Sequence, residues 1–296
     1  MENFLSSGFM LRQILILTLL TLIETGLCGI GFTASEKVWE RDGDVGMSRS
    51  VIAEYHTNDP AAQVKIWKQQ ITRPSGNPRF AEFQAERLRE WEATEFAPYR
   101  VNDPALIVQI REVFNPVLQL YNRQNCFAII LIDHPIPIMM NDNGVLMMIS
   151  KGLIERARSD DEILGHVAHE LAHDLHWRRT ARARSTLARC HERGSLDSPD
   201  AGNARDKLAR IEMECDAFSA LTLSALGRNA ILFAQYLEAT ERDYPDYLSL
   251  DLPPANLRAK VIAEVLPNGA AHPVPQMTEA FQKLKTMLSH HRSEKL

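Results

Sequence analysis

Two histidines and a glutamate, His169, Glu170 and His173, occur in the pattern His-Glu-x-x-His. On a helix this spacing places both imidazoles and the carboxylate on one side, as in a zinc site with an adjacent base. The two histidines are therefore the expected zinc ligands, and Glu170 is the expected general base. Because so short a motif also arises by chance, the surrounding residues decide its value.

The residues around this motif have the pattern of an amphipathic helix. At about 100° per residue the apolar positions share one half of the helical wheel. These positions are Ile163, Leu164, Val167, Ala168, Leu171, Ala172 and Leu175. The other half carries His166, His169, Glu170, His173 and His176. The pattern predicts a helix that packs its apolar half into a core and turns the motif toward a cleft, with Asp160 or Asp161 as its cap.

A catalytic zinc needs a third protein ligand. The metzincin class would place a third histidine at position 179, which is Arg here, so that class is excluded. A later segment offers Glu212 and Asp216, which at i and i+4 share one helix face. The apolar residues 217–223 that follow predict a largely buried helix, and buried carboxylates need partners such as a metal site. Glu214 is expected to point away, toward the surface.

These segments together resemble the gluzincin family of zinc metalloendopeptidases that includes the CAAX prenyl proteases, heat-shock membrane metalloproteases and soluble periplasmic envelope proteases. The resemblance covers about residues 103–265 and rests on the HExxH helix, the Glu212–Asp216 pair and the strand-like segment 144–154. It implies one Zn²⁺ per chain held by His169, His173 and Glu212, with Glu170 as general base. Asp216 would orient a ligand imidazole.

The chain departs from this family in two places. It has Ile136-Pro137-Ile138 where the family often has Asn-Ala-Phe, and a later Pro253-Pro254 with Arg258 lacks the preceding histidine. No group is therefore assigned to oxyanion stabilisation. The candidates are His166, His176, Tyr244, Tyr247, Arg258 and His272, for each of which a packing or surface role is the stronger expectation.

The pattern divides the chain into three parts. Residues 1–28 contain an apolar run at 14–23 that is typical of a signal peptide, and a membrane anchor over residues 9–32 is the alternative. Residues 36–100 are expected to form an N-terminal extension of two helices with one short ordered piece at 51–55. Residues 101–296 are expected to form the zinc metalloprotease domain, with a flexible loop at 194–202 before a helix from Asn203 to Leu226.

The expected fold class is α+β: a mostly helical zincin with a small β-sheet beside the HExxH helix and the third ligand on a later helix. Short strands are predicted at 126–132, 136–140 and 145–150. The last of these, around Val145, Met147 and Ile149, is expected to be an exposed edge on which an extended substrate pairs.

The expected function is hydrolysis of internal peptide bonds in protein substrates of the cell envelope, in the bacterial periplasm. Glu170 would take a proton from zinc-bound water and pass it to the leaving amine. The alternative is a zinc-binding envelope chaperone or adaptor of the same fold with little turnover. The net charge of −5 does not favour nucleic acid as a partner. An arginine-rich run at 178–193 is compatible with membrane proximity, although a solvated helix face is the stronger expectation.

Overall fold

The computed structural model describes residues 42–71, 79–245, 252–267, 273–275 and 277–293. The expected signal peptide or anchor lies outside the described residues. Within them, every helix is too short or too polar to cross a bilayer.

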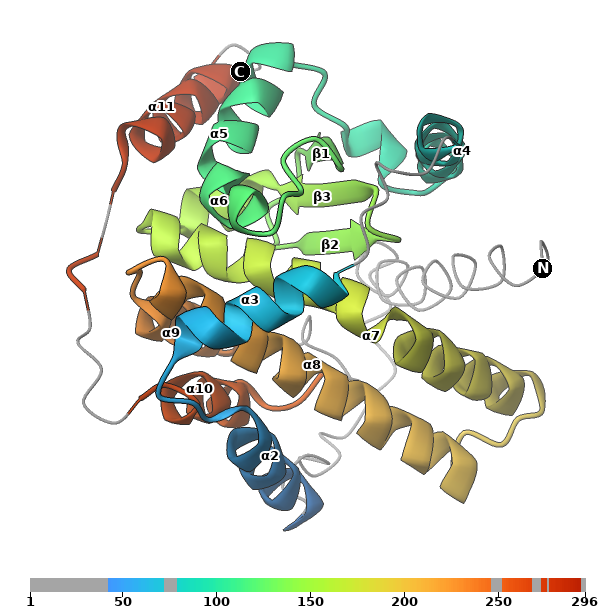
Figure 1. Cartoon of the computed structure of the whole chain (residues 1–296). Coiled ribbons are helices and arrows are strands. Elements are labelled where there is room, and N and C mark those ends of the chain that lie inside the picture. Colours follow the sequence, from blue (N-terminus) through green and yellow to red (C-terminus); the bar gives the residue numbers. More distant parts are fainter. Residues whose placement is uncertain (1–41, 72–78, 246–251, 268–272, 276, 294–296) are drawn as a thin grey trace.

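A three-stranded sheet lies in the upper half of the molecule (Figure 1), and the remaining elements are helices, so the fold is α+β and mostly helical. The strands are β1 (Ala128–Ile132), β2 (Met139–Asp142) and β3 (Leu146–Ser150), arranged in the order β1-β3-β2. β1 runs parallel to β3, and β2 runs antiparallel to it. The three strands correspond to the three apolar runs predicted from the sequence.

The expectation that the strand around Val145, Met147 and Ile149 is an exposed edge is wrong. β3 is the central strand, paired with β1 on one side and with β2 on the other, and all three side chains are fully buried. The continuous apolar run indicates that both faces of the strand are covered. Whether a strand is central or at an edge depends instead on which segments pair with it. β2 is the edge strand nearest the HExxH helix.

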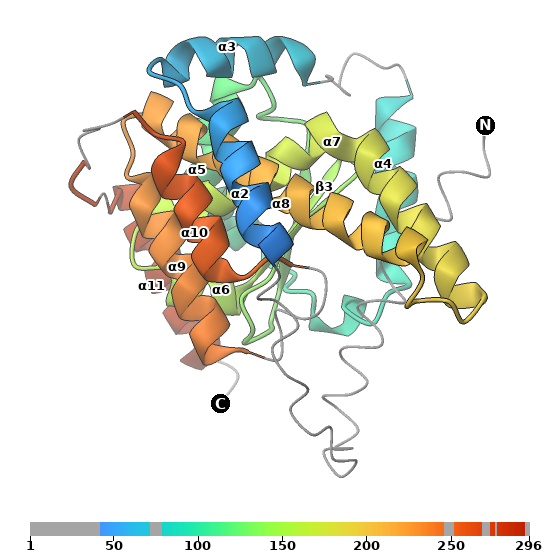
Figure 2. The same ribbon diagram turned by 90° about the horizontal axis from the view of Figure 1, so that it is seen from below.

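Two long helices form an antiparallel hairpin that extends beyond the body of the molecule (Figures 1 and 2). α7 (Asp160–Glu192) contains the HExxH motif, and α8 (Pro199–Ala225) contains Glu212 and Asp216. The arginine-rich run continues α7, and the segment expected to be a loop at 194–202 already enters α8 at Pro199. Pro at the first helical position with Ser198 as the capping residue explains the early start, since the Ser198 hydroxyl accepts from Ala201 N.

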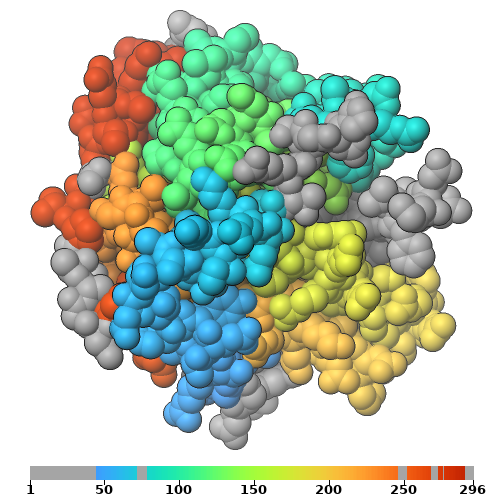
Figure 3. All heavy atoms as spheres, viewed as in Figure 1, coloured from blue at the N-terminus to red at the C-terminus, as the bar shows by residue number. Residues whose placement is uncertain are grey.

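The remaining helices surround the sheet and the hairpin. They are α2 (Asp42–Tyr55), α3 (Pro60–Gln70), α4 (Phe80–Glu92), the short 3₁₀ helix η2 (Ala97–Tyr99), α5 (Pro104–Leu120), α6 (Lys151–Arg156), α9 (Ala230–Asp243), α10 (Ala255–Glu264) and α11 (Glu279–Ser293). Residues 36–100 thus contain α2, α3 and α4 where two helices and a short piece were expected. α3 packs its Trp67 ring on Phe218 of α8, with ring centroids 4.5 Å apart. Figure 3 shows α2 and α3 in blue as one continuous surface beside the yellow-green α7.

Acidic residues tie the start of α7 to later parts of the chain instead of capping it. The N-cap is Ser159, whose side chain makes no capping bond. Asp160 accepts hydrogen bonds from the backbone N (2.9 Å) and the hydroxyl of Thr278, just before α11. Asp161 pairs with Arg228 at 3.4 Å, just before α9. The expected cap is therefore a tertiary anchor that fixes where α7 begins, ahead of the HExxH motif.

Gly152 of α6 lies in close contact with the loop that precedes β2. Its N donates to His134 O at 2.9 Å, and a Cβ added there would overlap the carbonyl group of Pro135. Because a backbone carbonyl cannot move aside as a flexible side chain can, Gly152→Ala is expected to lower the free energy of unfolding by roughly 1–3 kcal/mol.

Gly202→Ala is the matched control. Gly202 is also helical, but a Cβ there meets nothing within 4 Å. Its substitution is expected to raise stability by up to about 1 kcal/mol through helix propensity. Urea unfolding of both variants measures the difference, and equal stabilities would contradict the close approach.

Candidate metal centre

The two histidines of the motif face the carboxylate of Glu212 across the hairpin. His169 Nε2 lies 3.1 Å from Glu212 Oε2, and His173 Nε2 lies 3.8 Å from Glu212 Oε1. In a tetrahedral zinc site with bonds of about 2.0–2.2 Å, neighbouring ligand atoms are about 3.3–3.6 Å apart. The two separations lie just below and just above this range, so the three side chains that the sequence indicated come together at about the spacing of ligands around one metal ion.

Asp216 fixes the orientation of the His169 ring. Its Oδ1 lies 2.9 Å from His169 Nδ1, which leaves Nε2 turned toward Glu212. Arg258 of α10 donates to both oxygens of Asp216, from Nε at 2.7 Å and from Nη2 at 2.8 Å. A carboxylate that holds the second nitrogen of a ligand imidazole is the usual outer partner of a zinc histidine. Arg258, a candidate for oxyanion stabilisation from sequence, is instead committed to Asp216.

Cys215 is a further group in this centre that the sequence interpretation did not include. Within the described residues, His169, His173 and Cys215 offer ligand atoms that all lie within 4.8 Å of one another, so this group could hold a metal ion. The Cys215 sulfur lies 3.6 Å from His173 Nδ1, whereas Glu212 faces the Nε2 of the same ring. The signal for Cys215 was its i+3 spacing from Glu212, which puts both on one helix face.

Glu170 is held by the edge strand β2. The backbone N of Asn141 donates to Glu170 Oε2 at 2.8 Å, and the side-chain amide of Asn141 donates to the backbone O of Glu170 at 2.8 Å. The same amide also donates to Asp174 Oδ1 at 3.0 Å, and Asp174 pairs with the buried Arg123 at 2.9 Å. One oxygen of the Glu170 carboxylate is therefore held by the sheet. Asn141 gave no sequence signal, because only the folded sheet brings β2 against α7.

The electrostatics of the centre follow from burial and from the neighbouring charges. Burial raises the pKa of Glu212, but His173 and His169 outweigh this and hold that pKa well below its usual value. Burial also raises the pKa of Asp216, and Arg258 more than reverses the effect. For Cys215, burial and the surrounding carboxylates all act in one direction and raise the pKa well above its usual value. Without a bound ion, these shifts favour the anionic forms of Glu212 and Asp216 and the neutral thiol of Cys215.

The expectation that Glu214 lies at the surface is wrong. Its side chain is 2% exposed and binds Arg179 at 2.5 Å and Arg210 at 2.8 Å, and His176 Nδ1 lies 3.5 Å away. Two arginines satisfy a buried carboxylate that the sequence pattern assigned to solvent. Arg179, the residue at the position of the metzincin histidine, therefore anchors α7 to α8.

The other described candidates for oxyanion stabilisation make their contacts with residues outside the candidate metal centre. The ring of His166 lies between Phe233 and Tyr236, at centroid distances of 5.0 and 4.9 Å, and burial lowers its pKa to about 3. Tyr244 stacks under Arg156 at 5.7 Å. Tyr247 and His272 lie outside the described residues.

The hydrogen bonds of His169 predict how the stability of the metal-free protein depends on pH. Burial lowers its pKa, but the hydrogen bonds to Asp216 and Glu212 outweigh burial and raise the pKa to about 9. A raised histidine pKa stabilises the fold fully below the unfolded value of about 6.5, and this contribution is lost as pH rises toward 9. Between pH 7 and pH 8.5 the free energy of unfolding is therefore expected to fall by about 1.5 kcal/mol.

Denaturant unfolding of the chelator-treated protein across this range measures the slope. The lowered pKa values of His166 and His176 act mainly below pH 7, because stability from such groups is lost as pH falls through about 6.5. In a His169→Asn control the decline between pH 7 and pH 8.5 should disappear. An unchanged slope in that variant would refute the charged, doubly hydrogen-bonded imidazole.

Comparison of the sequence with known protein families finds none that matches, and comparison with curated proteins finds no match either.

Proposed function

We propose that the protein is a zinc-dependent endopeptidase acting on protein substrates of the cell envelope. The observation that carries the proposal is the placement of Glu212 of α8 between the Nε2 atoms of His169 and His173. Glu170 lies on α7 together with the two histidines. A general base next to two imidazoles and a carboxylate is the arrangement of a hydrolytic zinc site.

Glu212 is the better third ligand than Cys215. The Asp216 hydrogen bond directs His169 Nε2 toward Glu212, and His173 presents its own Nε2 to the same carboxylate. Cys215 meets His173 at the opposite ring nitrogen, Nδ1.

Zinc in this set would polarise a scissile carbonyl and lower the pKa of a coordinated water toward neutrality. The protein's own contribution to the proton transfers is Glu170, which would accept a proton from the attacking water and deliver it to the leaving amine. Because Asn141 N–H holds one oxygen of Glu170, the carboxylate keeps its orientation through both transfers. If the substrate binds as an extended chain beside the centre, its backbone partner is the edge strand β2 and not β3.

Metal content distinguishes the two ligand sets. Glu212→Gln is expected to weaken zinc binding by more than the roughly 10–100-fold that loss of an outer partner costs. Asp216→Asn is expected to fall within that 10–100-fold range. Cys215→Ala should bind about one zinc per chain, as the unsubstituted protein does. Elemental analysis and zinc titration with a competing chelator measure these effects.

The opposite pattern, with zinc lost in Cys215→Ala and retained in Glu212→Gln, would assign the metal to the thiol set. Circular dichroism of each variant separates lost zinc from lost fold. If the unsubstituted protein binds no zinc, the proposed function fails.

Glu170→Gln separates an enzyme from a binding protein. The amide keeps its size but cannot accept the proton, so cleavage of an unfolded protein substrate is expected to fall by roughly 10²–10⁴-fold with zinc retained. Glu192→Gln, the same change at the exposed end of α7, is the matched control and should cleave normally. The chelator-treated protein should also be inactive. A Glu170→Gln variant with full biological function would instead favour the zinc-binding chaperone or adaptor.

A further inference from the structure

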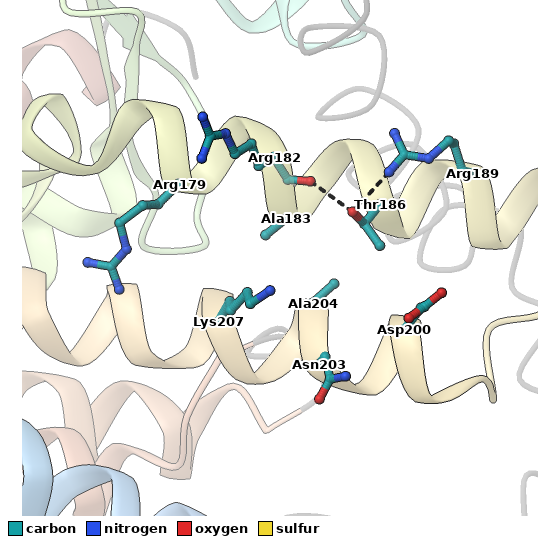
Figure 4. A pocket seen from close by; sticks show the side chains of 9 residues that line it. All are labelled: Arg179, Arg182, Ala183, Thr186, Arg189, Asp200, Asn203, Ala204 and Lys207. Atoms are coloured by element: carbon teal, nitrogen blue, oxygen red, sulfur yellow. Dashed lines mark hydrogen bonds between the residues drawn. The ribbon is translucent and has the colours of Figure 1, made fainter.

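A basic cleft lies along the outer half of the α7–α8 hairpin, away from the metal-binding turns. Its volume is about 530 Å³, within the usual range for small-ligand sites. Arg182 and Arg189 from α7 and Lys207 from α8 supply cations to its lining, and Asp200 supplies the acidic group. Figure 4 shows Lys207 in the gap between the helices, with the two arginines extending from α7.

Small residues on the facing sides of α7 and α8 leave room for this cleft. Ala183 of α7 and Ala204 of α8 face one another in Figure 4 and are almost completely buried, at 3% and 2% exposure. They belong to a small apolar cluster that holds the outer hairpin together. Because alanines occupy the contact positions, the longer polar side chains stand around a hollow instead of filling it.

The cations of the cleft are not neutralised by the protein. Arg189 donates to the hydroxyls of Ser185 (2.7 Å) and Thr186 (3.1 Å), which carry no charge. Among the described residues, Arg182 and Lys207 have no side-chain partner, and Asp200 forms no ion pair with any of the three. By contrast, Arg179 at the inner end of the cleft is paired with the buried Glu214. The protein therefore satisfies the arginine it uses for folding and leaves three cations around the hollow.

We propose that this cleft binds a ligand that carries a phosphate group, either a free phosphorylated small molecule or the headgroup of an anionic lipid. Arg182, Arg189 and Lys207 would bind the phosphate oxygens by charge-assisted hydrogen bonds. The hydroxyl of Thr186 and the amide of Asn203, on the same lining, add uncharged polar groups for the rest of the ligand. A concave site with cations from two helices fits a compact anion better than an extended acidic polypeptide, which would need a longer basic surface.

The test uses the full chain and two probes. Pyrophosphate binding is measured by calorimetry, and lipid binding by cosedimentation with phosphatidylglycerol vesicles against phosphatidylcholine vesicles. Arg182→Gln/Lys207→Gln removes two cations of the cleft. Arg178→Gln/Arg193→Gln removes the same charge from the same hairpin outside the cleft lining. Circular dichroism and zinc content show that each variant is folded.

We expect one pyrophosphate per chain, binding that weakens with salt, and a loss of about tenfold for each cleft cation removed. The control variant should change affinity less than threefold. Binding to phosphatidylglycerol vesicles alone, lost in the cleft variant, would identify a lipid headgroup as the source of the phosphate. Pyrophosphate binding without vesicle binding would identify a free ligand.

Three results would overturn the proposal. The first is no binding of either probe. The second is an equal loss in the control variant, which would show a diffuse basic surface. The third is binding of an acidic polypeptide such as polyglutamate in preference to both probes. None of these outcomes bears on zinc or cleavage, because neither substituted residue contacts the metal centre.

Discussion

The structure depends on one buried carboxylate, Asp216, and on what neutralises it. A charge this deep is costly unless it is paired and hydrogen-bonded. Arg258 from α10 supplies a bidentate pair, and His169 from α7 supplies a third hydrogen bond. Three helices are therefore joined at a single fully buried side chain. The same contacts turn His169 Nε2 toward Glu212, so that satisfying a buried charge also forms half of the metal centre.

The α7–α8 interface repeats this solution along its length. Glu214, two residues before Asp216, is satisfied by Arg179 and Arg210, and Arg210 also reaches Glu54 of α2 at 2.6 Å. On the other side of α7, Asp174 is satisfied by Arg123 and by the Asn141 amide that also contacts Glu170. Each of these acids thus joins α7 to a neighbouring element. The contacts that position the candidate metal centre are therefore also contacts that keep the elements together.

Sequence patterns predicted those parts of the fold that depend on local periodicity. These parts are the HExxH helix, the three short strands, and the later helix that carries Glu212 and Asp216 on one face. They followed from residue spacing and from the apolar residues around them. Glu214 was misplaced because alternation with Glu212 suggested an outward position, whereas α2 and the arginines of the hairpin cover that side too. β3 was wrongly expected at an edge because strand order depends on which segments pair. A five-residue apolar run does not indicate which strands will pair with it. The contact between Asn141 and Glu170 could not be predicted for the same reason, because it depends on β2 packing against α7.

Cys215 shows why the choice of a third ligand would depend on ring orientation as well as on proximity. Its sulfur is as well placed as a ligand atom can be by distance alone, 3.6 Å from a histidine nitrogen. Yet each imidazole can present only one nitrogen to a given metal, and the choice is set by what the other nitrogen contacts. For His169 that contact is Asp216, whose charge is fixed in turn by Arg258. Arg258 on α10 thereby supports the orientation of His169 that faces Glu212. The choice between Glu212 and Cys215 would then depend on His173, which meets the carboxylate at Nε2 and the thiol at Nδ1.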